Sequence, residues 1–418
     1  MIFPTSMSNM SEVNEARVGE PALLHPDLAF IPLEDELVVF SESAQKLIGL
    51  NKTAAFLARR MERGASAAML ADMLVQELGV PAGEAGGWVR TTLAALKSHG
   101  LLDDGTVPLA SGPSAVEKAM AHMRAMVPPV MEPFEPQAEG RYRLLDTLAL
   151  VRCSHRAQLN LIDAVIGHLK SEETATPNFI IDVQGKLWGD RQLCSNIYSD
   201  GDPQAQAIKL SKLGPLVKTT LWVKAVNSYD YLMNLHAGVV GRDGRCILLP
   251  AEAGSGKSSL TAALMHSGLG YYSDEVALIE PDSFQVPPVP LAICVKSTGW
   301  NVMLRMFPEL TSLRTHIRDD DKTVRYCAPP SGSVQKQPAK VSHIFFPRYA
   351  KDSVTALTPL RHSEAVTRLL GQCQAAPRRL SRDDVRDIVR WISTIDCYAL
   401  SFSSLEEAVQ LVRRVAFA

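Results

Sequence analysis

The side chains best suited to chemistry lie between Cys246 and Leu260, where the chain reads Cys-Ile-Leu-Leu-Pro-Ala-Glu-Ala-Gly-Ser-Gly-Lys-Ser-Ser-Leu. The apolar start of this stretch predicts a buried strand, its small residues predict a loop, and its end opens a helical pattern through Met265. Glycines let backbone N–H groups curl around a phosphate, and a helix N-terminus adds a favourable dipole. We therefore predict a nucleotide-binding loop of the Walker A kind. The residues expected to contact the nucleotide are Ala253, Gly254, Ser255, Gly256, Lys257, Ser258 and Ser259.

Two side chains of this loop have defined tasks in such a site. Lys257 would reach the terminal phosphates of ATP, and the Ser258 hydroxyl would ligate Mg²⁺. Ala251 stands where such loops usually have their first glycine, so this position must be able to adopt a negative φ. The alternative is a Gly/Ser turn before an ordinary helix, but the strand before the loop and the helix after it favour nucleotide binding.

An acidic pair, Asp274-Glu275, follows Ser258 by 16 residues and precedes an apolar strand. This distance suffices for a helix and a return strand, so the pair can face the same phosphates. One carboxylate can then accept a hydroxyl proton while the other helps to hold Mg²⁺. His236 lies one predicted hairpin before the loop and could return to its mouth. The alternatives are a solvated turn for the acidic pair and a structural role for the histidine.

Composition narrows the classes of function. The 418 residues carry 43 Lys and Arg against 45 Asp and Glu, a net charge of −2, so nothing points to nucleic acid or an anionic membrane as an obligatory partner. The seven cysteines form no CxxC pair, which predicts neither a zinc site nor a disulfide framework and fits a cytoplasmic protein. Residues 1–20 lack the pattern of a secretory signal, and no apolar run reaches membrane-spanning length.

The elements before the loop divide into several regions. Residues 1–22 are polar and are expected to be flexible. Within 23–103, a hairpin over 28–33 and 37–40 and three short helical patterns predict a small winged-helix-like α+β domain. A DNA-binding winged helix is the alternative. The third helix argues against it, because Arg90 and Lys97 are its only basic residues.

Further along the chain, residues 104–140 read as a Pro-rich linker with a short helical piece at 115–126. Residues 141–230 predict an α+β subdomain in which we find no chemistry. Its expected strands are 144–151 and 179–183, and its expected helices are 157–169 and 203–213. Residues 231–418 form the expected P-loop domain. Its tail, with helices over 363–372, 383–395 and 405–416 and a strand over 397–402, should complete the kinase layer.

Residues 25–103 resemble the PqqD family, the peptide-recognition elements of systems that modify ribosomal peptides. The likeness rests on Leu37-Val-Val-Phe40, Ile48-Gly-Leu-Asn-Lys-Thr-Ala54, the spacing of the second helix, and Leu93-x-x-Leu96-x-x-x-Gly100-Leu-Leu102. Members of this family bind a leader peptide as an added strand at the edge of a sheet, beside a helix. The resemblance thus implies a precursor or leader peptide as the partner of this domain.

Residues 140–418 resemble the HPr kinase/phosphorylase family. The likeness rests on Leu235-His-Ala-Gly-Val239, Gly254-Ser-Gly-Lys-Ser-Ser259, Ser273-Asp-Glu-Val276, Leu291-Ala-Ile-Cys-Val-Lys-Ser-Thr-Gly-Trp300 and His343-Ile-Phe-Phe-Pro-Arg-Tyr349. The predicted fold is an α/β P-loop kinase domain, similar to the C-terminal domain of HPr kinase, preceded by the winged-helix-like α+β domain. The resemblance implies that Lys257 binds phosphate and that Asp274, aided by His236, takes the proton of an accepting serine. Ser258 ligates magnesium, and Glu275 is assigned to the metal with it.

The chain departs from this family at two points. Glu275 replaces the usual second aspartate, and the Glu-x-Arg-Gly signature is absent, with Lys296 near its place. HPr itself is therefore not the expected substrate. Lys296 could meet a phosphate or the acceptor, or lie at the surface, and Arg325 and Arg348 are further candidates for phosphate contacts. The charged segment 314–325 is expected to be a solvated loop, with a lid over the site as the alternative.

These expectations define an ATP- and Mg²⁺-dependent kinase that phosphorylates a Ser or Thr hydroxyl of a precursor peptide captured by the N-terminal domain. One alternative is a nucleotide-switched peptide chaperone without kinase activity, and another is a kinase of a small-molecule hydroxyl. Nucleic acid and membrane are not expected partners. The family resemblance adds a homo-oligomer as an expectation.

Overall fold

The computed structural model describes residues 24, 27–98, 101–102, 130–188 and 192–417. Two compact units emerge from the contacts within the chain. Unit 1 comprises Met1–Gly112, Leu360–Gly371 and Arg378–Thr394, and unit 2 comprises Pro113–Pro359, Gln372–Pro377 and Ile395–Ala418. The predicted flexible terminus at 1–22 and the helical piece at 115–126 lie outside the described residues.

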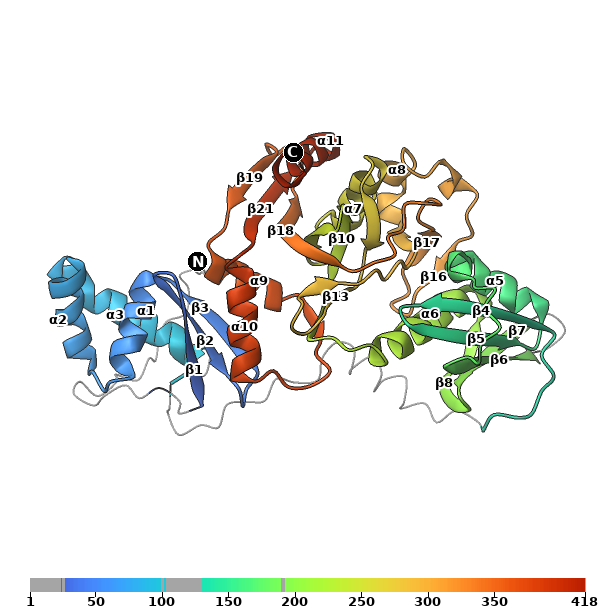
Figure 1. The fold of residues 1–418 in the computed structure, drawn as a ribbon, viewed down its shortest axis with the longest axis horizontal. Helices are drawn as coiled ribbons and strands as arrows, with labels where there is room; N and C mark the ends of the chain where they lie inside the picture. Colours follow the sequence, from blue (N-terminus) through green and yellow to red (C-terminus); the bar gives the residue numbers. More distant parts are fainter. Residues whose placement is uncertain (1–23, 25–26, 99–100, 103–129, 189–191, 418) are drawn as a thin grey trace. The chain divides into compact units, whose positions relative to one another are not determined.

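Unit 1 is built on a three-stranded antiparallel sheet in the order β1-β2-β3 (Figure 1). Its elements are β1 (Leu28–Leu33), β2 (Glu36–Ser41), β3 (Lys46–Leu50), α1 (Lys52–Met61), α2 (Ala67–Leu78), α3 (Ala82–Ser98), α9 (His362–Leu370) and α10 (Arg382–Ile392). The predicted hairpin and the three following helices are present. Asn51 caps α1 as expected, because its side chain accepts a hydrogen bond from the Ala54 N–H. β3 was not predicted, since its five residues are too few to show a clear alternation.

Strand β2 is buried at all six positions, so both faces of the sheet are covered. Leu37 and Val39 belong to a core cluster with residues of α1, α2 and α3. Because successive side chains of a strand point to opposite faces, Val38 and Phe40 face the other way. On that face α9 lies against β2 and β3, and α10 lies against β1 and β2. The sheet is therefore the middle layer of three.

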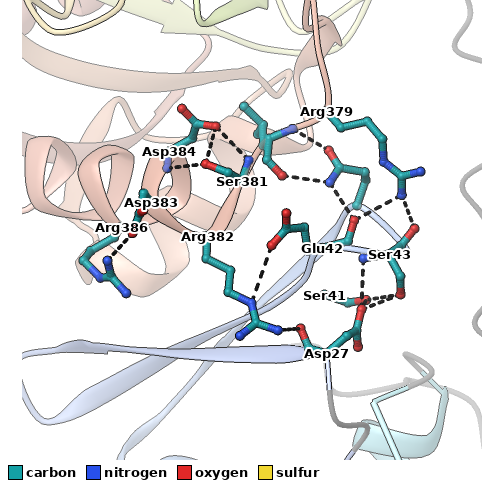
Figure 2. Close-up of polar contacts among 12 residues, drawn as sticks. Asp27, Ser41, Glu42, Ser43, Arg379, Ser381, Arg382, Asp383, Asp384 and Arg386 are labelled. Atoms are coloured by element: carbon teal, nitrogen blue, oxygen red, sulfur yellow. Dashed lines mark hydrogen bonds and ion pairs between the residues drawn. The ribbon is translucent and has the colours of Figure 1, made fainter.

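Polar contacts hold the two late helices to the two turns of this sheet. At the β1–β2 turn, the buried Glu36 carboxylate accepts hydrogen bonds from Arg361, at 3.0 Å, and from the Ser363 hydroxyl. At the β2–β3 turn, Arg382 forms an ion pair with Glu42 at 3.5 Å, and it also donates to the carbonyl of Asp27, the residue before β1 (Figure 2).

This arrangement corrects the expectation that the whole tail completes the kinase layer: the predicted strand 397–402 and helix 405–416 do belong to unit 2, but α9 and α10 do not. The apolar pattern of the tail predicted α9 and α10 correctly as helices, but periodicity does not specify which sheet an apolar helix face will cover. Here both helices cover the N-terminal sheet. The predicted domain 231–418 is thus interrupted twice by segments of unit 1.

Unit 2 joins the predicted α+β subdomain and the P-loop domain. Its strands are β4 (Ala138–Leu144), β5 (Thr147–Cys153), β6 (Phe179–Trp188), β7 (Gln192–Ser199), β8 (Asp202–Lys209), β9 (Met233–Leu235), β10 (Ala237–Arg242), β11 (Arg245–Pro250), β12 (Gly270–Ser273), β13 (Ala277–Ile279), β14 (Gln285–Val286), β15 (Ile293–Lys296), β16 (His316–Ile317), β17 (Thr323–Cys327), β18 (Ala339–Tyr349), β19 (Ala356–Pro359), β20 (Cys373–Ala375) and β21 (Asp396–Phe402). Its α-helices are α5 (Arg156–Ile166), α6 (Leu210–Asn227), α7 (Lys257–His266), α8 (Trp300–Met303) and α11 (Leu405–Ala416). Short 3₁₀ turns are η1 (Gly167–Leu169), η2 (Ser297–Gly299) and η3 (Pro308–Thr311).

The largest sheet of unit 2 positions the predicted loop. Its order is β12-β10-β11-β18-β21-β19, with β14 paired to β18, and β11, β18 and β21 run parallel to one another. Helix α7 packs on β10 and β11, and α11 packs on α7. The strand–loop–helix order predicted for 246–265 is therefore present. The loop begins where β11 leaves the sheet, after Pro250.

The region before this sheet differs from the expectations in three places. The predicted strand 144–151 corresponds to β5, but its first residues belong to the turn of the β4–β5 hairpin, where Leu145 has φ 51°. The predicted helix 203–213 is instead β8 followed by the start of α6, because residues 202–209 pair with β7 and sheet pairing overrides helix propensity. The predicted linker 104–140 ends earlier, since β4 begins at Ala138.

The five-stranded sheet β4-β5-β6-β7-β8 shares a core with α5 and α6. Within the part of the chain that the structure describes, no helix has the length and apolar character needed to cross a membrane.

A substitution in α10 tests which unit the tail stabilises. Ile388 is fully buried, so Ile388→Ala should cost ~2–5 kcal/mol of stability and should act on unit 1. Hydrogen exchange should show faster exchange of the β1 and β2 amides and unchanged exchange in β10 and β11. Arg386→Ala, at an exposed position of the same helix, is the control. Loss of protection in β10 and β11 alone would place the tail in the kinase layer after all.

Candidate active site

The loop Ala251–Gly256 connects β11 to α7, and its backbone requires glycine. Gly254 and Gly256 have φ of 94° and 87°, a region that other residues rarely adopt. A Cβ at Gly256 would also lie 2.8 Å from the ring of Phe402. Ala251 is not among the described residues with positive φ, as its identity requires.

The loop and the first turn of α7 present polar groups suited to an anion. No side chain caps the N-terminus of α7, so its first N–H groups remain available. The Ser255 hydroxyl is buried and has no hydrogen-bond partner among the described residues. Ser255 does not border the cavity that the loop lines, so the groups that match the needs of a phosphate are the first N–H groups of α7.

Lys257 connects this loop to the predicted acidic pair. Its side chain is buried, and Nζ donates to the Asp274 carbonyl and lies 3.5 Å from Asp274 Oδ1. Burial raises the pKa of Asp274, and the Lys257 ammonium opposes that shift. The Ser258 hydroxyl also hydrogen-bonds to the Asp274 carboxylate. The structure therefore brings Lys257, Ser258 and Asp274 together.

Glu275 has a different partner. Its Oε2 accepts a hydrogen bond from Lys218 Nζ at 2.6 Å. The Lys218 ammonium holds the pKa of Glu275 at about 2, well below its usual range. Lys218 lies on α6, in the region where the sequence indicated no chemistry. The only signal was a lysine between Val217 and Leu221, on the apolar side of a helix.

His236 lies between β9 and β10, beside the short strand β20. Its backbone N–H donates to the Gln372 carbonyl at 2.8 Å, and its ring Nδ1 lies 3.1 Å from Gln374 Nε2. Burial, with a smaller effect of the Lys257 ammonium, lowers the pKa of His236 to about 4. The imidazole is therefore neutral at pH 7. Gln374 was not predicted, because a strand of three residues far along the chain leaves no pattern.

These side chains line one cavity of about 1320 Å³. His236, Gly254, Gly256, Lys257, Ser258, Ser259, Asp274 and Glu275 all border it, as does Ala253. Ser255, whose hydroxyl is buried in the loop, is not among the lining residues. The volume exceeds the range of about 300–1,000 Å³ typical of a site for one small ligand, which leaves room for a second reactant beside a nucleotide.

The other basic residues that the sequence offered as phosphate contacts differ in whether they reach the cavity. Lys296 borders the cavity, whereas Arg325 stacks on the Trp300 ring at 4.1 Å and donates to the Leu310 carbonyl. Arg348 is exposed and does not line the cavity. Segment 314–325 is a hairpin: β16 pairs with the start of β17, and only residues 318–322 between them form the predicted loop. From this segment Arg318 and Lys322 reach the cavity.

A divalent cation could be held by oxygen ligands of this site. In the described residues no group of three or more His, Cys, Asp or Glu is arranged to bind a metal ion. Mg²⁺ does not require such a group, because it commonly uses one or two carboxylates, phosphates of the substrate and water. The Ser258 hydroxyl and the two neighbouring carboxylates supply this kind of ligand.

Comparison with models of protein families matches one part of the chain. Residues 36–102 match the sequence model of the family described as coenzyme PQQ synthesis protein D (PqqD). No curated protein matches the chain.

Several solved structures show similarity to parts of the chain, among them the following three. TbiB1, solved in complex with the TbiA(beta) leader peptide, has 19% identity and a TM-score of 0.19, covering 20% of this chain and 99% of its own. A lasso peptide synthetase B1 complexed with the leader peptide has 24% identity and a TM-score of 0.19, covering 20% of this chain and 96% of its own. The Hpr(Ser) kinase/phosphatase from Coxiella burnetii has 15% identity and a TM-score of 0.23, covering 43% of this chain and 88% of its own. Residues 36–102 are therefore a PqqD-like segment, as the sequence predicted.

Proposed function

We propose that this chain is an ATP-dependent kinase that phosphorylates a Ser or Thr hydroxyl of a ribosomally made precursor peptide. The observation that carries the proposal is the cavity in which Lys257 and Ser258, at the start of α7, meet Asp274, Glu275 and His236. An anion-binding helix start opposite paired carboxylates is the arrangement that phosphoryl transfer needs.

The chain's own residues divide the work as follows. The loop N–H groups and Lys257 bind and orient the phosphates of ATP. Asp274 accepts the proton of the attacking hydroxyl, and its raised pKa favours this task over permanent ionisation. Neutral His236 keeps its place through Gln374 and helps to position the reacting groups. Ser258 and Glu275 would hold Mg²⁺, which neutralises charge on the transferred phosphoryl group.

The PqqD-like segment supports a peptide as the acceptor. Two solved structures with a similar segment are complexes with leader peptides. Capture of the leader by unit 1 would raise the effective concentration of the acceptor residue at the kinase site.

The direct experiment incubates the full chain with Mg²⁺, labelled ATP and a precursor peptide encoded beside its gene. The kinase proposal expects the label on the peptide, with the mass gain of one phosphoryl group per modified residue. Nucleotide turnover without labelled peptide would instead identify a nucleotide-switched chaperone.

Removing the proposed base should separate binding from chemistry. Asp274→Asn should bind ATP nearly as well as the unaltered chain but transfer its phosphoryl group ~10²–10⁴-fold more slowly, because it accepts no proton. Calorimetry measures the first quantity, and single-turnover transfer measures the second. Asp282→Asn, an exposed position of positive φ that asparagine tolerates, is the control. Near-normal transfer by Asp274→Asn would refute the assignment.

Removing the leader from the precursor peptide should test whether capture of the leader by unit 1 delivers the acceptor residue to the kinase site. A precursor peptide without its leader should lose ~10²–10⁴-fold in kcat/KM, chiefly through KM, because the acceptor no longer gains from intramolecular delivery. Steady-state kinetics of the two peptides make the comparison. Equal kcat/KM values would contradict capture. Changing the substrate is cleaner than deleting residues 1–103, which would uncover the apolar faces of α9 and α10.

A further inference from the structure

The Glu275 side chain is fixed from a part of the fold that the proposed mechanism does not use. Lys218, in the middle of α6, places Nζ 2.6 Å from Glu275 Oε2. The Lys218 side chain is only 5% exposed, whereas that of Glu275 is 33% exposed and borders the cavity. The lysine therefore approaches the carboxylate from the protein interior, on the side away from the opening.

Lys218 occupies an environment that normally excludes a cation. Val217 and Leu221 of the same helix are fully buried in the apolar core of unit 2. The ring of Tyr326 lies 5.6 Å from the ammonium. Removing an ammonium from water is strongly unfavourable, and a buried ion pair often stabilises a fold no better than apolar side chains of similar size. Packing and stability alone give no reason for a lysine here.

The neighbouring carboxylate is held by another lysine from another helix. Asp274 contacts Lys257 at the start of α7, and Glu275 contacts Lys218 of α6. The backbone of Glu275 is fixed as well, because its N–H donates to the Ser273 hydroxyl at 3.3 Å. Two adjacent carboxylates thus have independently fixed directions, which allows them to take different tasks.

We propose that Lys218 is a positioning residue for the Mg²⁺–nucleotide site, which it serves by holding Glu275 in the direction required of a metal ligand. This inference rests on the proposed function, in which Glu275 and Ser258 bind the ion. Groups that orient a metal ligand typically contribute 10- to 100-fold to metal affinity, although they never touch the ion. Lys218 fulfils this description, since its partner among the described carboxylates is Glu275 alone.

The test measures the affinity of the full chain for ATP by calorimetry, with Mg²⁺ and with EDTA. Lys218→Met should weaken binding of ATP with Mg²⁺ by about 10-fold or more and leave binding in EDTA within about 3-fold. Lys224→Met, on the same helix but paired with Asp200, should change neither value and is the matched control. In a Glu275→Gln background, Lys218→Met should have no further effect, because its partner is already altered.

Each other result has a definite meaning. Equal weakening with Mg²⁺ and EDTA, additive effects of the two substitutions, or unchanged affinities would overturn the positioning role. Thermal unfolding shows whether each variant is folded. If a single variant is not folded, the double variant Lys218→Met/Glu275→Gln is measured in its place. If the unaltered chain gained no ATP affinity from Mg²⁺, the proposed kinase function itself would fall, and the inference with it.

Discussion

The candidate site depends on two contacts between a lysine and a carboxylate. Lys257 binds Asp274, and Lys218 binds Glu275. The first contact ties the start of α7 to the residue that follows β12, and the second ties α6 to the same turn. Because the two acidic residues are neighbours in the chain, two helices, α6 and α7, converge on one dipeptide. The cavity exists where they meet.

The part of this arrangement that is local in sequence was predictable. Small residues between an apolar strand and a helix have few interpretations, so the loop at 251–256 and its lysine followed from the sequence. The Asp274-Glu275 pair was placed correctly because one helix and one return strand fix the distance. The role of Lys218 was not predictable, because the lysine is 57 residues from Glu275 in the sequence. The helix α6 that carries it was also not recognised, since residues 203–213 read as a helix of their own and not as β8 followed by the start of α6.

The fold shows a similar boundary between local pattern and long-range packing. The hairpin, the first three helices, α7, β21 and α11 were all visible in the pattern of apolar residues. The destination of α9 and α10 was not, because an amphipathic helix specifies an apolar face and not its partner. Glu36 could have drawn attention to the missing partner. Because the structure buries this glutamate, its carboxylate needs a cation or a hydroxyl, and Arg361 and Ser363 provide both.

The segment from Leu360 to Thr394 belongs to unit 1 except at Gln372–Pro377, where strand β20 supplies Gln374 to the His236 ring in unit 2. Unit 1, which contains the PqqD-like segment, therefore cannot be exchanged as one continuous stretch of sequence, by recombination or by protein engineering. A graft must carry three separate stretches of sequence and rejoin the chain on both sides of β20. Descent of this chain from a simple end-to-end fusion would have required the two partners to adapt their sequences to each other.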